Sequence, residues 1–181
     1  MSRIGKQPIN VPAGVTVTVD TNNLVVVEGK LGKLEQKISK LIKVEVNSNV
    51  VTLTTVDSSK EANSMHGLYR TLISNMVEGV TNGFSKTLII NGVGYKAFDK
   101  GDHIQLNIGY SHPVEVRPME GIKLSCPTVT EIKVEGASKE KVGQMAASIR
   151  AIKPVEPYHA YGIRYSDEVV IRKEGKTAGK K

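Results

Sequence analysis

The sequence predicts an α+β protein of two tandem, internally duplicated domains, each a mostly antiparallel β-sheet with one helix packed on one face. Short runs in which apolar and polar residues alternate indicate strands, and two longer stretches with apolar residues at three- and four-residue steps indicate amphipathic helices. The same order of elements, strands followed by one helix, occurs twice along the 181 residues. Trp is absent and only two Phe occur, so the core must consist mainly of Val, Ile and Leu, which favours sheet.

The first half opens with strands and ends with a helix. Five runs have the pattern of strands, at residues 15–19, 24–28, 34–38, 42–47 and 50–55. A helix is expected from Ser58 to Val80, since Ser58 and Glu61 have the spacing of a capping box and Gly83 follows the pattern. Its expected core face comprises Ala62, Met65, Tyr69, Leu72, Met76 and Val80. A recognition stripe of Met65, Leu68, Leu72 and Met76 is the alternative.

The second half repeats this plan. Its expected strands lie at about 86–91, 94–99, 103–109, 113–117, 122–126 and 130–135. A helix follows from Ser138 to Lys153, and Pro154 ends it. Its expected apolar face is Val142, Met145, Ile149 and Ile152. The halves align at a shift near 80 residues, with Arg70 matching Arg150, so duplication explains the pattern. We therefore expect domains at 1–82, with a basic N-terminal arm, and at 83–181.

Charge and composition limit the function. The net charge is +7, and residues 150–181 hold eight Lys or Arg against four acids. Arg3 and Lys6 make the N-terminal arm basic as well, so anionic partners are expected at both ends, nucleic acid rather than membrane. The single cysteine, Cys126, excludes a disulfide within the chain. No apolar run has the length of a membrane span and the start lacks the pattern of a signal peptide, so a cytoplasmic protein is expected.

The motifs of enzymes are weak or absent. Gly92, Gly94 and Ala97 have the spacing of a dinucleotide-binding turn, but a strand, not a helix, is expected to follow. The four histidines are scattered without partners at metal-ligand spacing. We therefore expect no enzyme, no catalytic residue, no metal, no cofactor and no small-molecule substrate.

The segment 153–176 has the most informative chemistry. Three tyrosines alternate with His159, Gly162 and Arg164, and a basic strand and tail are expected to follow. Flat rings beside cations suit stacking on bases and pairing with phosphates, although an edge strand with a solvated basic end would look similar. Tyr110 and His112 form a second stacking-capable pair, for which a hairpin bend is the simpler interpretation.

Several uncommon strings resemble the family of bacterial large-subunit ribosomal protein six. They occur in the family's order at 1–6, 66–67, 75–77, 92–97, 109–114, 142–144, 156–158 and 162–165. The resemblance covers the whole chain. It implies a duplicated α+β fold and a non-catalytic protein on the cytoplasmic ribosome. It further implies binding to large-subunit ribosomal RNA, mainly through the C-terminal domain near the sarcin–ricin loop. Neighbouring large-subunit proteins and the stalk base, where translational GTPases dock, would lie close by.

The family's RNA-binding loop corresponds to 156–165, where this chain departs from the usual pattern. Pro154 and Val155 replace a basic residue and a proline, and His159, Ala160 and Tyr161 replace Lys, Gly and Lys. The loop should therefore depend less on lysine charge, and Ala160 would be costly if its φ were positive. The expected RNA-binding residues are Arg3, Lys6, Lys153, Tyr158, His159, Tyr161, Gly162, Arg164, Tyr165, Arg172, Lys173, Lys176, Lys180 and Lys181. The alternative function is a non-ribosomal protein-interaction scaffold that uses exposed sheet edges.

Overall fold

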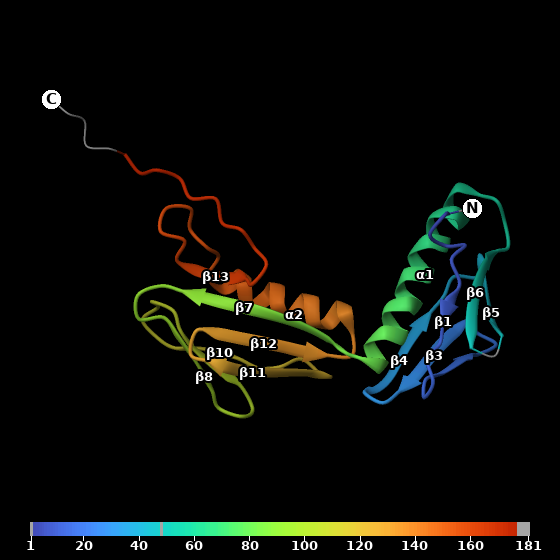
Figure 1. Ribbon diagram of the computed structural model, residues 1–181, viewed down its shortest axis with the longest axis horizontal. Coiled ribbons are helices and arrows are strands. Elements are labelled where there is room, and N and C mark those ends of the chain that lie inside the picture. Colours follow the sequence, from blue (N-terminus) through green and yellow to red (C-terminus); the bar gives the residue numbers. More distant parts are fainter. Residues whose placement is uncertain (1, 48, 177–181) are drawn as a thin grey trace. The chain divides into compact units, whose positions relative to one another are not determined.

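The protein folds as two compact units. The computed structural model describes residues 2–47 and 49–176. The first unit comprises the chain up to Phe84 together with Ala137–Lys139, and the second comprises Ser85–Gly136 and the chain from Glu140 onward (Figure 1). The domain ranges 1–82 and 83–181 stay a prediction.

The first unit combines one helix with two small antiparallel sheets. Its elements are β1 (Ile9–Asn10), β2 (Thr16–Val19), β3 (Leu24–Gly29), β4 (Gly32–Lys37), β5 (Ile42–Asn47), β6 (Val50–Thr55) and α1 (Lys60–Thr81). One sheet has the order β2-β3-β4 and the other β1-β6-β5. Strand β1 was not expected, because two residues are too few to show an alternating pattern.

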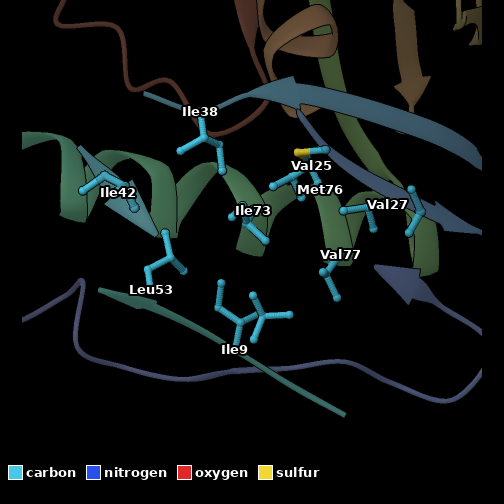
Figure 2. Packing of buried hydrophobic residues seen from close by; sticks show 11 residues of the cluster. Ile9, Val25, Val27, Ile38, Ile42, Leu53, Ile73, Met76 and Val77 are labelled. Carbon is cyan, nitrogen blue, oxygen red and sulfur yellow. The ribbon is translucent and has the colours of Figure 1, made fainter. Parts of the chain in front are cut away.

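The core of this unit lies between α1 and both sheets. Ile73 and Val80 of the helix are fully buried against Val25 and Val27 of β3 and Ile42 of β5 (Figure 2). Burial of such side chains contributes about 1.5–3 kcal/mol each.

The helix follows the prediction with two corrections. Ser59, not Ser58, is the N-cap, since its Oγ accepts a hydrogen bond from the Ala62 N–H at 3.2 Å and its backbone is extended. The core face also includes Ile73 and Val77, which the predicted face omitted. The alternative of a recognition stripe fails, because Met76 is buried in the core while Leu68 is half exposed on another side of the helix.

The second unit has the same arrangement with one strand added. Its elements are β7 (Phe84–Asn91), β8 (Lys96–Asp99), β9 (Ile104–Asn107), β10 (Val114–Val116), β11 (Ile122–Thr128), β12 (Glu131–Gly136), α2 (Lys139–Ile152) and β13 (Gly162–Tyr165). The sheets have the orders β8-β9-β10 and β11-β12-β7-β13. The buried residues of α2 are Val142, Met145, Ala146 and Ile149.

The predicted class is confirmed as a duplicated α+β fold, with each unit's strands divided between two sheets. Alternation along a strand shows which side chains face the core but not which strand is its neighbour. The segment after β13 corrects the prediction of a basic strand: residues 169–176 have no regular secondary structure.

Candidate nucleic-acid interface

The loop between α2 and β13 is closed by backbone hydrogen bonds. The Ile163 N–H donates to the Lys153 carbonyl at 2.8 Å, and the Glu156 N–H donates to the Tyr161 carbonyl at 3.0 Å. Gly162 makes this closure possible, because a Cβ there would lie 2.7 Å from the Pro154 carbonyl oxygen and its φ is +138°. Gly162 is buried, so its role here is to shape the loop.

Glu156 organises the tip of the loop. Its carboxylate accepts hydrogen bonds from the backbone N–H groups of Tyr158 (3.2 Å) and His159 (2.8 Å), and it lies 3.2 Å from the His159 ring. Partial burial acts to raise the pKa of Glu156, but these donors outweigh it and lower the pKa. The carboxylate therefore stays charged and acts as the acceptor of the turn.

Ala160 has a positive φ, the conformation that was expected to be costly for alanine at this position. Its φ is +62°, in the left-handed region that glycine adopts more easily. The Asn91 side chain, at the end of β7, donates to the Ala160 carbonyl at 2.8 Å. Ala160 is buried, so packing and this hydrogen bond hold the strained residue in place.

The aromatic residues of the segment divide into two groups. Tyr158, His159 and Tyr161 are exposed at the tip, and the rings of His159 and Tyr161 are stacked with centroids 5.3 Å apart. Tyr165 is half-buried, with the cations of Lys86 and Arg150 at 5.6 and 5.7 Å from its ring centroid. Tyr165 therefore braces the loop, while the other three rings remain accessible.

Arg164 is used within the protein. Its Nη1 donates to the carbonyl of Glu168 at 3.0 Å and to that of Tyr165 at 3.4 Å. Glu168 in turn binds the guanidinium of Arg150 through both carboxylate oxygens, with Nε to Oε2 at 2.8 Å. These hydrogen bonds lower the pKa of Glu168 against the opposing effect of burial. Contact of Arg164 with phosphate stays a prediction.

The tail after β13 is attached to the loop. The Lys173 N–H donates to the Pro157 carbonyl at 2.9 Å, so the tail passes beside the tip. Arg172, Lys173 and Lys176 are exposed along it. A hollow of about 340 Å³ lies between the tail and the base of the loop, with Arg164 and Arg172 in its lining. Lys180 and Lys181 lie outside the described residues.

The remaining predicted RNA-binding residues lie outside the tip of the loop and the tail. Lys153 is adjacent to the loop, with its Nζ 4.8 Å from the centroid of Tyr110, whose hydroxyl donates to the Ile152 carbonyl at 2.7 Å. The turn that contains Tyr110 is thus connected to the start of the loop, which favours a structural role for this ring. Arg3 and Lys6 are exposed in the first unit and are not part of this loop and tail.

Sequence reasoning missed the residues that support the loop. Lys86 and Asn91 lie on β7, far along the chain from their partners Tyr165 and Ala160, and neither has a local motif. Their only signal in the sequence is their place on a strand that ends beside the loop.

The described part of the chain was searched for cofactor, nucleophile and metal sites and for membrane-spanning helices. Strand β8 begins at Lys96, so the glycine-rich turn is followed by a strand, as expected, and not by the helix that a dinucleotide-binding turn requires. Burial, with a contribution from Asp99, raises the pKa of the Cys126 thiol to about 11, which makes it a poor nucleophile. Within residues 2–47 and 49–176, no cluster of three potential metal ligands is found. No described helix is long and apolar enough to cross a membrane.

Comparison with known proteins identifies the family. The family described as ribosomal protein L6 matches residues 11–83 and 91–166. The large ribosomal subunit protein uL6 of Exiguobacterium sibiricum is 54% identical over 98% of this chain and 99% of its own length. The proteins of the same name from Clostridium acetobutylicum (52%, over 98% and 99%) and Herpetosiphon aurantiacus (51%, over the full length of both) are similarly related. The chain belongs to the ribosomal protein L6 family, which makes it a ribosomal protein rather than an enzyme.

Proposed function

We propose that this chain is a structural component of the large ribosomal subunit in the cytoplasm. In this proposal it binds large-subunit ribosomal RNA mainly through residues 153–176. The three relatives named above, which cover 98–100% of the chain, are large ribosomal subunit proteins by name. The second unit supplies a rigid support, and the loop and tail supply the contact surface.

The observation that carries the proposal is that the carboxylates near the loop are paired with cations from outside the segment, whereas the cations of the tail are exposed. Glu168 is paired with Arg150, and Asp167 lies 3.6 Å from Lys86, so cations outside the segment compensate both carboxylates. Arg172, Lys173 and Lys176 are exposed on a tail that the loop holds in place, and such cations attract the phosphate backbone.

The proposal includes further contacts and neighbours. Arg3 and Lys6 would contact RNA from the first unit, and Lys180 and Lys181 would extend the basic tail. We place the bound RNA near the sarcin–ricin loop and the stalk base, so that translational GTPases and other large-subunit proteins are close. No cofactor takes part.

A salt titration tests the contribution of the tail. Alanine at Arg172, Lys173 or Lys176 should reduce the slope of log affinity against log salt for a large-subunit rRNA fragment by about 0.7–0.9 for each phosphate-binding cation removed. Lys43→Ala, which removes an exposed cation of β5 in the first unit, is the matched control and should leave the slope unchanged. Equal slopes for all four variants would contradict the proposal.

The alternative of a non-ribosomal protein-interaction scaffold is disfavoured by the family to which the chain belongs, although one observation at the tail would suit a contact with another protein. Val169 and Ile171 are more than four-fifths exposed, which is unusual for apolar side chains. The scaffold predicts that the protein does not co-sediment with ribosomes in high salt and keeps its partner after deletion of residues 172–181. Footprinting of rRNA in subunits with and without the protein would show protection only if the ribosomal proposal holds.

A further inference from the structure

The tip of the loop presents a preformed pair of rings. The imidazole of His159 and the phenol of Tyr161 have centroids 5.3 Å apart and planes inclined by 19°, the geometry of an offset stack. The His159 side chain is 71% exposed and Tyr161 is 37% exposed. A pair of flat rings in water leaves its outer faces open to a third ring.

The charge at the tip favours a base over a phosphate. The Glu156 carboxylate lies 3.2 Å from the His159 Nδ1 and receives two backbone N–H groups. A phosphate placed on this side of the imidazole would be close to that negative charge. A nucleobase has no net charge and can stack on the ring without this repulsion.

Hydrogen bonds fix the backbone that carries both rings. His159 and Tyr161 flank Ala160, whose carbonyl is held by Asn91 and whose φ is positive. The bond from the Glu156 N–H to the Tyr161 carbonyl closes the turn around them. Less conformational entropy is then lost when a base binds, because the backbone that carries the rings is already held in place.

Cations lie next to the rings. The backbone of Lys173 is bonded to Pro157, two residues before His159, so exposed Lys173 and its neighbour Arg172 pass beside the tip. Rings for a base and cations for its phosphate thus occur together, the combination that proteins use to bind single-stranded nucleic acid.

We propose that His159 and Tyr161 form a stacking platform for one unpaired nucleobase of the bound RNA, with the adjacent phosphate on Lys173 or Arg172. The platform rests on the proposed RNA-binding function and adds a preference for unpaired nucleotides.

Ring-removing and ring-keeping variants of the full chain test the platform. One variant carries His159→Leu with Tyr161→Leu, the other carries His159→Phe with Tyr161→Phe, and Phe98→Leu removes an exposed ring of β8 as the matched control. The probes are a large-subunit rRNA fragment, a short single-stranded oligoadenylate and a blunt RNA duplex of equal length. Affinities and salt slopes are measured for each probe.

The leucine variant should bind oligoadenylate about tenfold or more weakly, as expected for the loss of one base–aromatic stack, with the affinity for duplex and the salt slope unchanged. The phenylalanine variant and Phe98→Leu should bind as the wild type does. Equal losses on duplex and single strand, or a loss in the phenylalanine variant as large as in the leucine variant, would overturn the platform. If the wild type binds the rRNA fragment and the leucine variant binds every probe as tightly as the wild type does, only the platform fails. If the wild type does not bind the fragment, the proposed function fails first.

Discussion

Strands β1 and β7 occupy equivalent places in the two units, but they have different neighbours. In the first unit β1 is an edge strand in the order β1-β6-β5, whereas in the second β7 is flanked by β12 and β13. The added strand carries the loop and tail, and its pairing covers an edge of β7 that would otherwise expose unpaired backbone groups. Duplicated units can therefore share a core while only one carries an added strand, loop and tail, provided that the addition has a free edge on which to pair.

The largest expected effect comes from a substitution that weakens the pairing of the added strand. Gly162→Val places a side chain against the carbonyls of Pro154 and Lys153 at a φ that valine avoids, so we expect the loop and β13 to lose about 3 kcal/mol of local stability. Amide exchange at Ile163 should accelerate accordingly. Gly175→Val, where an added Cβ meets no atom within 4 Å, is the control. Unchanged protection at Ile163 in the Gly162 variant would show that the closure does not hold the strand.

A second comparison concerns ion pairs in the two units. Glu168→Gln breaks a bidentate pair with Arg150 in which both side chains are partly buried, and we expect it to lower the free energy of unfolding of the second unit by about 1–2 kcal/mol. Glu45→Gln breaks the exposed pair with Lys43 in the first unit and should cost about 0–0.5 kcal/mol. Urea unfolding of both variants measures this, and equal effects would contradict the assigned role of Glu168.

The same carboxylate should make the second unit sensitive to acid. The pKa of Glu168 is lower in the folded protein than in the unfolded chain, so its stabilisation is complete above the unfolded value of about 4.3. It is lost as the pH falls through the lower folded value. Unfolding free energies measured from pH 6 down to pH 3 should therefore fall more steeply for the wild type than for Glu168→Gln. Parallel curves would show that the pair does not contribute.

The smallest expected effect concerns the strained residue of the loop. Ala160→Gly relieves a left-handed conformation, and after the entropy of glycine is subtracted we expect a gain of about 0.5 kcal/mol. Ala147→Gly on the exposed side of α2 should instead destabilise by about 1 kcal/mol. Thermal unfolding compares the two, and a loss of stability in both variants would mean that Ala160 is not strained.

Local patterns in the sequence determined the secondary structure, the duplication and the chemistry of the loop. Helical and strand periods depend on which side chains face the core, so both helices and most strands were predictable, as was the duplicated order of elements. The chemistry of the loop was also visible, since Tyr158, His159 and Tyr161 are close in sequence and exposed in the structure.

The tertiary structure decided how these local features are used. It divided the strands of each unit between two sheets, paired β13 with β7, and used Arg164 and Tyr165 to hold the loop while the tip and tail stayed accessible. These outcomes depend on partners distant in sequence, such as Asn91 with Ala160 and Arg150 with Glu168. Periodicity reports only whether a side chain is buried, whereas hydrogen bonds and ion pairs between distant segments depend on which surfaces the folded chain brings together.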